Sequence, residues 1–270
     1  MRAFSKCTAL RTITLPPAFT KIGSGNSGYG NGYCAFNGCT SLENINVPPS
    51  LYYIGNSAFS GCTSLEKLDL SNVTYIGASA FNNCSKLRNL ADTSKVETLG
   101  SSAFNSCKSL KNISLPSLTS NLGSNTFHNC TSLERIDSLG TTAKTIADGK
   151  GGNYSDYGFA YGCTLLTYVD LSCITSIGAS AFYGCKSLEN INFSESITVI
   201  NNNAFYGCSL LNKDINLPNL TSLGSSAFNT TKIKKVSNLG NITAINSYTF
   251  NNCTELTEFT DPISNCTYES

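Results

Sequence analysis

The sequence predicts a β-rich repeat solenoid of short parallel strands, with little α-helix. Three recurring patterns favour this fold class: a Phe-x-x-Cys pair, a Leu-x-x-Leu-x-Leu stretch after the cysteine, and an Ile-Gly step before the next phenylalanine. Repetition at a fixed period of about 20–50 residues is typical of stacked structural units rather than of a globular domain with one core.

The first pattern sets the period of the repeat. Successive cysteines lie 22 or 23 residues apart, except for two intervals of 32 and 33 residues, and Thr231 stands where a further cysteine is due. The column comprises Cys7, Cys39, Cys62, Cys84, Cys107, Cys130, Cys163, Cys185, Cys208 and Cys253. Parallel strands stack about 4.8 Å apart, whereas the Cβ atoms of a disulfide lie roughly 3.5–4.5 Å apart. We therefore predict a buried ladder of thiols in place of disulfides. The states of three other cysteines stay open: Cys34, Cys173 and Cys266.

The coil from Cys62 to Phe81 contains the other two patterns. Its Leu-x-x-Leu-x-Leu stretch has apolar residues spaced for the buried face of a short strand. Its Ile76-Gly77 step predicts a turn, because glycine tolerates positive φ. An Ala-Phe pair then places a ring in the interior, and the next cysteine begins another coil.

Three departures from the pattern predict local irregularity. Phe159 and Ala160 exchange the usual Ala-Phe order, Thr231 replaces a cysteine, and Asp214 shifts the following strand by one residue. We expect the coil after Cys208 and the coil after Thr231 to be distorted or less well packed.

These motifs resemble the BspA-like leucine-rich repeat family, also called the type 5 or Treponema-pallidum-like class. The family pattern is Cys-x-x-Leu-x-x-Ile-x-Leu-Pro, a spacer, and Ile-Gly-x-x-Ala-Phe-x-x-Cys. The resemblance extends from Phe4 to about Asp261. It implies a right-handed leucine-rich-repeat solenoid, a single domain over residues 1–270, with about eleven coils of 22–23 residues.

Charge and hydropathy exclude some classes of partner. The net charge is +1, and the 18 Lys and Arg residues are scattered rather than gathered into a stripe, so no nucleic-acid partner is expected. No apolar run reaches the 18 or so residues of a membrane span, and the N-terminal sequence MRAFSKC has no signal-peptide core. The sequence gives no prediction of oligomeric state.

Two insertions, at about 24–33 and 148–157, follow the Ile-Gly position of their coils and should leave the same edge of the solenoid. They are rich in Tyr, Gly, Ser and Asn, the composition of adaptable recognition loops, although neutral loop growth would give the same composition. Asp148 and Asp156 have no spacing typical of a calcium site. The candidate ligand-binding residues in these insertions are Asn26, Tyr29, Asn31, Tyr33, Lys150, Asn153, Tyr154, Asp156 and Tyr157.

A third candidate is the aromatic column Tyr161, Tyr183 and Tyr206 in successive coils beside the second insertion. Stacked rings could hold a sugar or a peptide, but a ladder that only stabilises the turn is the favoured interpretation. A polar row on the strands is interpreted as a solvated surface: Asn46, Asp69, Ser114, Asp137, Asp170 and Asn192.

Catalysis has little support in the sequence. The single histidine, His128, is interpreted as a solvent-facing turn residue, and the chain has no Cys-x-x-Cys pair and no phosphate-binding glycine loop. We expect no enzyme activity, no metal and no cofactor.

The family resemblance implies a function as well as a fold. Proteins of this family are typically exposed on the surface or secreted, in bacteria and certain protists, and are associated with adhesion to host proteins or to other cells. The resemblance therefore implies an extracellular or cell-surface, non-catalytic module that binds a protein or cell-surface ligand. The alternative is a spacer or scaffold within a larger intracellular or phage protein.

Overall fold

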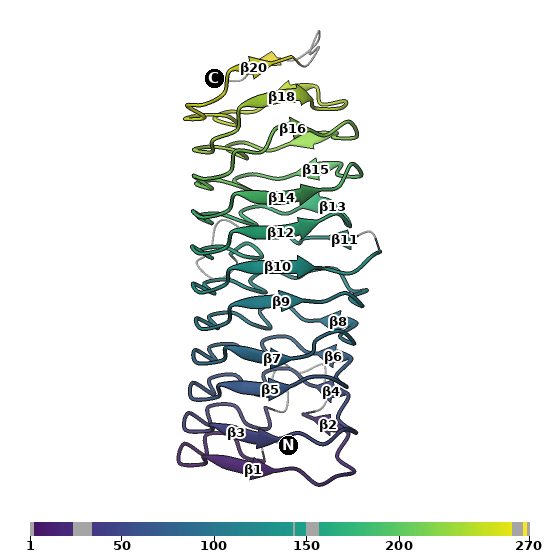
Figure 1. Cartoon of the computed structure of the whole chain (residues 1–270), viewed down its shortest axis with the longest axis vertical. Helices are drawn as coiled ribbons and strands as arrows, with labels where there is room; N and C mark the ends of the chain where they lie inside the picture. The colour runs from purple at the N-terminus through teal and green to yellow at the C-terminus, as the bar shows by residue number, and fades with distance from the viewer. Residues whose placement is uncertain (1–2, 24–33, 143, 150–156, 261–266, 269–270) are drawn as a thin grey trace.

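The structure, a computed structural model, describes residues 3–23, 34–142, 144–149, 157–260 and 267–268. Over these residues the chain winds into an elongated stack in which each coil lies on the one before it (Figure 1). All the strand pairs are parallel, and no helix occurs in the described part of the chain. The predicted β-solenoid is confirmed.

One side of the stack, here called the first face, consists of the strands that follow the cysteine column (Figure 1). Equivalent residues of neighbouring coils lie opposite one another, as Ile13 does with Ile45 and Val169 with Ile191. The strands of the first face are β1 (Thr12–Thr14), β3 (Asn44–Asn46), β5 (Lys67–Asp69), β7 (Asn89–Ala91), β9 (Asn112–Ser114), β10 (Arg135–Ser138), β12 (Tyr168–Leu171), β14 (Asn190–Phe193), β16 (Ile215–Asn216), β18 (Lys235–Asn238) and β20 (Glu258–Phe259).

A second face is formed by shorter strands that end near the Ile-Gly position of each coil. Most of them also pair in register, so that Tyr53 lies opposite Tyr75 and Tyr75 opposite Thr98, but a register shift occurs between Lys144 and Thr145. The strands are β2 (Lys21–Ile22), β4 (Tyr53–Ile54), β6 (Tyr75–Ile76), β8 (Thr98–Leu99), β11 (Lys144–Thr145), β13 (Ile174–Ile177), β15 (Val199–Ile200), β17 (Ser222–Leu223), β19 (Ala244–Ile245) and β21 (Thr267–Tyr268).

Hydrogen bonding along the first face is not continuous. The described strands form four separate sheets, with breaks between β3 and β5, between β7 and β9, and between β14 and β16. The coils on either side of these breaks are held together by the turns, by the interior side chains and, at two of the breaks, by the second-face pairs β4–β6 and β15–β17.

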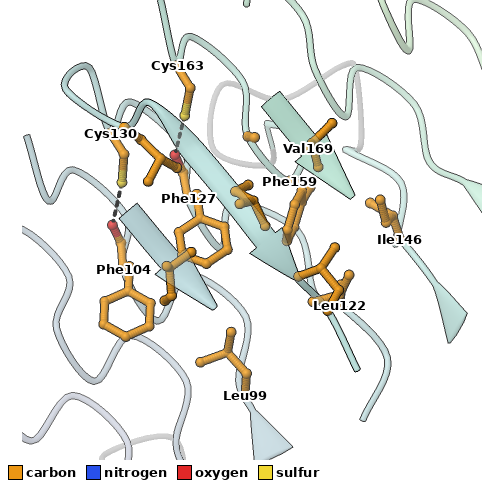
Figure 2. Close-up of a cluster of buried hydrophobic side chains, with 14 of the residues drawn as sticks. Leu99, Phe104, Leu122, Phe127, Cys130, Ile146, Phe159, Cys163 and Val169 are labelled. Atoms are coloured by element: carbon orange, nitrogen blue, oxygen red, sulfur yellow. Dashed lines mark hydrogen bonds between the residues drawn. The ribbon is translucent and has the colours of Figure 1, made fainter. Parts of the chain in front are cut away.

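The interior is filled by a column of phenylalanine rings, part of which Figure 2 shows. From Phe4 to Phe127 the neighbouring rings stack with centroids 5.3–5.7 Å apart and planes within 6° of parallel. The same stacking resumes from Phe182 to Phe250. Each ring thus covers the faces of its neighbours, and one coil cannot bury its phenylalanine without the next.

The exchange of Phe159 and Ala160 interrupts this stack. The backbone keeps both residues in their predicted columns, because the Phe127 amide donates to the Phe159 carbonyl and the Ala160 amide donates to the Ala181 carbonyl, each at 2.7 Å. The ring of Phe159 meets Phe127 at 86° and Phe182 at 75°. It therefore enters the core from the neighbouring position and turns on edge to fill the space left by Ala160.

Buried thiols link each coil to the one before it. The Sγ atom of Cys130 donates to the carbonyl oxygen of Phe104 at 3.0 Å, and that of Cys163 donates to Phe127 at 3.0 Å (Figure 2). The Phe104 carbonyl also accepts the amide of Cys107 in its own coil, at 3.1 Å. All ten column cysteines are present as thiols; eight are buried as predicted, whereas Cys7 is exposed and Cys253 is half-buried. A small side chain with one weak donor therefore meets the needs of this buried position.

Burial also raises the pKa of these thiols, to about 12 at Cys62 and to about 12 at Cys163. At Cys62 the neighbouring thiol of Cys39 contributes in the same direction. Because the thiolate is the nucleophile, a buried thiol of raised pKa is chemically inert at neutral pH.

The predicted reason for glycine in the Ile-Gly step is wrong at most positions. Gly77 has no positive φ; instead, a Cβ atom there would lie 2.6 Å from the amide nitrogen of Asn56 in the preceding coil. Positive φ occurs instead just before the cysteine, as at Gly61 (φ 75°) and Asn83 (φ 59°). At Gly77 the close approach of the preceding coil, not a left-handed turn, leaves no room for a side chain, whereas other coils accept Asn201 or Asn246 at this position.

The two predicted irregular coils are distorted but well packed. β16 and β18 pair with a register shift between Ile215 and Asn216, as expected from the extra Asp214. Ile233 and Val236 are nevertheless fully buried, so of the two predicted alternatives the distortion is observed and the looser packing is not. The hydroxyl of Thr231 donates to the carbonyl of Phe228 in its own coil, at 2.9 Å, and so keeps the buried position hydrogen-bonded without a thiol.

Candidate functional site

The residue that follows the interior phenylalanine lies on the outside of its turn, where it is half-buried. This position holds Asn105, His128, Tyr161, Tyr183 and Tyr206 in five successive coils, with Ala160 replacing the phenylalanine before Tyr161. Together with Tyr157, the aromatic members form one continuous surface feature. We call His128, Tyr157, Tyr161, Tyr183 and Tyr206 the aromatic strip.

Backbone hydrogen bonds between coils set the spacing of the strip. The amide of Gly162 donates to the carbonyl of Tyr183, and the amide of Gly184 donates to the carbonyl of Tyr206, each at 2.8 Å. Gly162 and Gly184 have φ values of 73° and 70°, a conformation that glycine adopts without steric cost. The turn therefore holds equivalent side chains one coil apart and in the same orientation.

The three tyrosines predicted from the sequence are brought together. The ring centroids of Tyr161 and Tyr183 are 4.7 Å apart with planes 3° from parallel, and those of Tyr183 and Tyr206 are 4.7 Å apart at 5°. Both faces of the Tyr183 ring are thus covered by its neighbours. A sugar that stacks on an aromatic face cannot use this ring, whereas a partner that contacts ring edges and hydroxyl groups can.

The other end of the strip contains His128 and Tyr157. Their rings stack at 4.3 Å and 7°, and Tyr157 also contacts Tyr161 at 4.8 Å and 52°. The Nδ1 atom of His128 lies 3.2 Å from Oδ1 of Asn105 in the preceding coil. His128, interpreted from the sequence as a solvent-facing turn residue, is therefore half-buried and belongs to the strip.

The strip is electrically neutral near pH 7. Desolvation by burial, and then the neighbouring tyrosines, raise the pKa of Tyr161 and the pKa of Tyr183. Burial lowers the pKa of His128. The described neighbours of this imidazole are an amide and two phenol rings. The strip thus offers neutral hydrogen-bonding groups and aromatic edges, which are suited to recognition.

Eight of the candidate residues lie outside the described part of the chain: Asn26, Tyr29, Asn31, Tyr33, Lys150, Asn153, Tyr154 and Asp156. The described ends of the second insertion are tied to the solenoid. Asp148 accepts the amide of Ala179 at 2.8 Å and the Nδ2 group of Asn201 at 2.6 Å. The Tyr157 carbonyl accepts the amide of Asn125 at 3.2 Å, so Tyr157 is already in register with the coils.

The structure adds an aromatic pair that the sequence analysis missed. Tyr53 and Tyr75 stack on the second face at 4.5 Å and 7°, next to the described end of the first insertion. The ammonium of Lys21 lies 5.4 Å from the ring centroid of Tyr52 and 5.7 Å from that of Tyr53. The signal in the sequence that could have identified this pair is the spacing of its tyrosines, which lie 22 residues apart, the length of one repeat.

The polar row predicted on the strands lies on the outside of the first face. Asp69 and Asp137 are exposed and Asp170 is half-buried, and the amide of Asn192 donates to Oδ1 of Asp170 at 3.1 Å. Over the residues that the structure describes, no three His, Cys, Asp or Glu side chains are grouped as a metal site would require. The same residues include no helix of the length and apolarity needed to cross a bilayer.

Solved structures of similar fold come from bacterial proteins. A leucine-rich repeat protein from Eubacterium ventriosum ATCC 27560 is 23% identical, with a TM-score of 0.55, and the match covers 83% of this chain and 65% of that one. The pneumococcal vaccine antigen PcpA is 21% identical, with a TM-score of 0.51, over 99% of this chain and 80% of that one. At these identities the likeness concerns the fold alone. Comparison with curated proteins finds no match.

The family comparison covers nearly the whole chain. The model described as "BspA type Leucine rich repeat region (6 copies)" matches residues 1–26, 32–147 and 153–269. The two interruptions, at 27–31 and 148–152, fall within the predicted insertions. The coil pattern, the parallel stack and this match agree: the chain belongs to the BspA-type leucine-rich repeat family.

Proposed function

We propose that this chain is a non-catalytic protein-binding or adhesion module of a surface or secreted protein, and that it recognises a protein or cell-surface ligand through the aromatic strip. We further propose that residues 1–270 act as one solenoid domain of about eleven coils. The observation that supports the binding role is the row of Tyr161, Tyr183 and Tyr206, whose rings are parallel and only half-buried.

The chemistry of the strip favours a protein ligand over a sugar. Tyrosine supplies a large contact area and a hydroxyl group at a low cost in conformational entropy. The stacking within the strip has already ordered these side chains, so that a partner need not immobilise them. The covered faces of Tyr183 leave ring edges and hydroxyl groups for contact, and these suit an irregular protein surface.

The position of the strip also supports this proposal. Tyr157 is a strip member and the last residue of the second insertion, so that any contact made by residues 150–156 would adjoin the strip. Per-repeat insertions in solenoids commonly lie on the binding face. The candidates Lys150, Asn153, Tyr154 and Asp156 would extend the same surface. The first insertion, with Asn26, Tyr29, Asn31 and Tyr33, would form a second contact.

A triple variant tests the strip: Tyr161→Asn, Tyr183→Asn and Tyr206→Asn. Asparagine occupies this position naturally at Asn82 and Asn105, so the turn accepts it. The measurement is binding of the purified protein to intact cells and to a panel of immobilised extracellular-matrix proteins. We expect the wild-type protein to bind at least one surface and the variant to lose that binding by about tenfold or more.

The matched control removes the other stacked pair. Tyr53→Thr and Tyr75→Thr introduce the residue that Thr98 supplies at the same register of the second face. This variant should bind as the wild-type protein does. Equal binding by the triple variant would remove the strip from the proposal. Absence of binding by the wild-type protein to every cell and matrix surface would instead favour the spacer alternative.

A further inference from the structure

The first face has an irregular coil that the repeat pattern does not explain. Ala91 occupies the position that Asp69 and Ser114 hold in the neighbouring coils, so the polar row is interrupted there by a small apolar side chain. The next residue, Asp92, stands at the register of Leu70, which is fully buried. Because a carboxylate cannot replace a buried leucine, the backbone departs at Asp92 from the path that it follows in the preceding coil.

The change of course opens the sheet. Asp92 is exposed with a φ of 32°, and Thr93 takes the interior position. The Thr93 hydroxyl donates to the carbonyl of Ser114, which links the two coils by a side chain where a strand ladder would otherwise do so. β7 consequently pairs with β5 and β9 with β10, and the sheet is broken between β7 and β9.

Two hollows flank Leu90, the central residue of β7. The first, of about 330 Å³, lies at the break and is lined by Leu90, Asp92, Ile113, Ser114 and Asp137, among others. The second, of about 450 Å³, is lined by Asn46, Lys67, Asp69, Leu90 and Ala91, among others. Leu90 is only half-buried. The two hollows share Leu90 and together follow the solenoid axis from β3 to β10, and we call them the groove.

The charged residues that line the first hollow are of one sign, although Arg135 forms an ion pair with Asp137 at 2.7 Å. The two charged residues that line it, Asp92 and Asp137, are carboxylates. The hydroxyl and amide of Ser94, and secondarily Lys95, lower the pKa of Asp92 and keep it ionised. Arg135 donates to Oδ1 of Asp137, but its guanidinium lies 4.3 Å from the ring centroid of Tyr168. Tyr168 is in the following coil, on the side of Asp137 away from the hollow.

We propose that this groove docks a protein partner through a lysine or arginine side chain, which enters the hollow between Asp92 and Asp137 while an adjoining apolar residue packs on Leu90. The apolar lining by Leu90 and Ile113 fits the aliphatic stem of a basic side chain, and the carboxylates fit its charged end. This surface is separate from the aromatic strip, so the proposal can be tested independently of the proposed role of the strip.

A defined peptide tests the groove. The probe is a fluorescent hexapeptide that alternates leucine with arginine, and the control peptide has glutamine in place of arginine. Binding is measured by fluorescence anisotropy at two salt concentrations. We expect the arginine peptide to bind at least about tenfold more tightly than the glutamine peptide, with weaker binding at high salt.

Two variants locate the contact. Asp92→Asn combined with Asp137→Asn removes both charges and keeps the shape; asparagine also tolerates the positive φ at position 92. Asp170→Asn removes a carboxylate of the same polar row in β12, outside the residues that line the hollows. The double variant should lose the preference for arginine, whereas Asp170→Asn should retain it. Equal preference in the double variant, or equal binding of the two peptides to the wild-type protein, would overturn the proposal.

Discussion

The cysteine column and the aromatic strip are two ladders separated by one residue in the sequence, as Tyr183 and Cys185 are. The interior ladder occurs along the described stack, with Thr231 in place of one cysteine, because each coil must cover the phenylalanine of its neighbour. The exterior ladder is confined to the coils around the second insertion; elsewhere the position holds asparagine or serine. Periodicity shared by all coils thus reflects the fold, whereas periodicity in a subset of coils is a candidate for function.

The largest expected effect is a fall in the free energy of unfolding as the pH rises, to which all the buried thiols of the interior ladder contribute. The folded-state pKa of the buried thiols is raised above the ordinary value of 9.0, to about 12 at Cys62 and Cys163. Their contribution to stability is therefore fully present below pH 9 and is lost as the pH rises toward 12, because only the unfolded chain releases the protons. Each such thiol should lower the free energy of unfolding by about 1.4 kcal/mol per pH unit in this window.

Urea unfolding of the reduced protein at a series of pH values from about 8 upward measures this effect. Cys84→Ala removes one fully buried thiol and should reduce the slope by the share of a single group. A free energy of unfolding that does not change between pH 8 and 10 would show that the thiols are accessible in the folded protein.

The next effect is the loss of one interior ring. Phe104 is fully buried between Phe81 and Phe127, at centroid distances of 5.3 and 5.7 Å. Phe104→Ala should lower the free energy of unfolding by about 3–5 kcal/mol, because it removes apolar contact and leaves a cavity. The control is Asn105→Ala, the adjacent residue on the outside of the turn, with an expected change below about 1 kcal/mol. Similar losses for the two variants would contradict the division between interior and exterior.

A smaller effect distinguishes glycines that lie close to the preceding coil from glycines that have a positive φ. Gly77→Ala would place a Cβ atom 2.6 Å from the amide nitrogen of Asn56, and we expect it to cost about 1–3 kcal/mol through overpacking between coils. Gly184→Asn changes a glycine of positive φ that has nothing near its Cβ position. Asn83 adopts the same conformation at the equivalent position, so this variant should melt within a few degrees of the wild-type protein. Thermal unfolding of both variants tests whether Gly77→Ala lowers the melting temperature more than Gly184→Asn does.

Much of the fold could be predicted from the sequence because the interior repeats along a single axis, with each coil in contact only with its neighbours. Each buried column repeats at a fixed interval, so a pattern such as Phe-x-x-Cys identifies neighbours in space without any knowledge of the topology. Even the exchange of Phe159 and Ala160 was visible as a reversed pair. What could not be predicted was the edge-on packing of Phe159, whose ring plane lies at 86° to that of Phe127 and depends on the shape of the gap.

The remaining differences arise where the sequence pattern concerns contacts between coils. The Ile-Gly step was interpreted within a single coil, whereas its cause is the backbone of the preceding coil. The groove at Ala91 and Asp92 was not predicted, although an aspartate at a leucine position was visible in the sequence. The sequence alone indicates a solvent-facing turn residue at His128, because the contact of His128 with Tyr157 crosses the second insertion, where the regular period fails.

The smallest expected effect is on the stability contributed by the strip itself. Single and double variants at Tyr161 and Tyr183, each to asparagine, form a double-mutant cycle. Each stacked pair should contribute about 0.5–1.5 kcal/mol, and the cycle should return a coupling of that size. Urea unfolding measures the coupling, and a cycle of Tyr53 and Tyr75, each to threonine, supplies the reference for a stacked pair outside the strip.

The comparison of the two cycles distinguishes a stabilising ladder from a contact surface. If the rings only stabilise the turn, both cycles give similar coupling energies, and neither pair of substitutions changes binding to cells or matrix proteins. If the strip is the contact surface, the stability effects remain similar while the loss of binding is confined to Tyr161 and Tyr183. A coupling energy of zero at Tyr161 and Tyr183 would mean that their stacking is not maintained in solution, and the preordered surface on which the binding proposal depends would be lost.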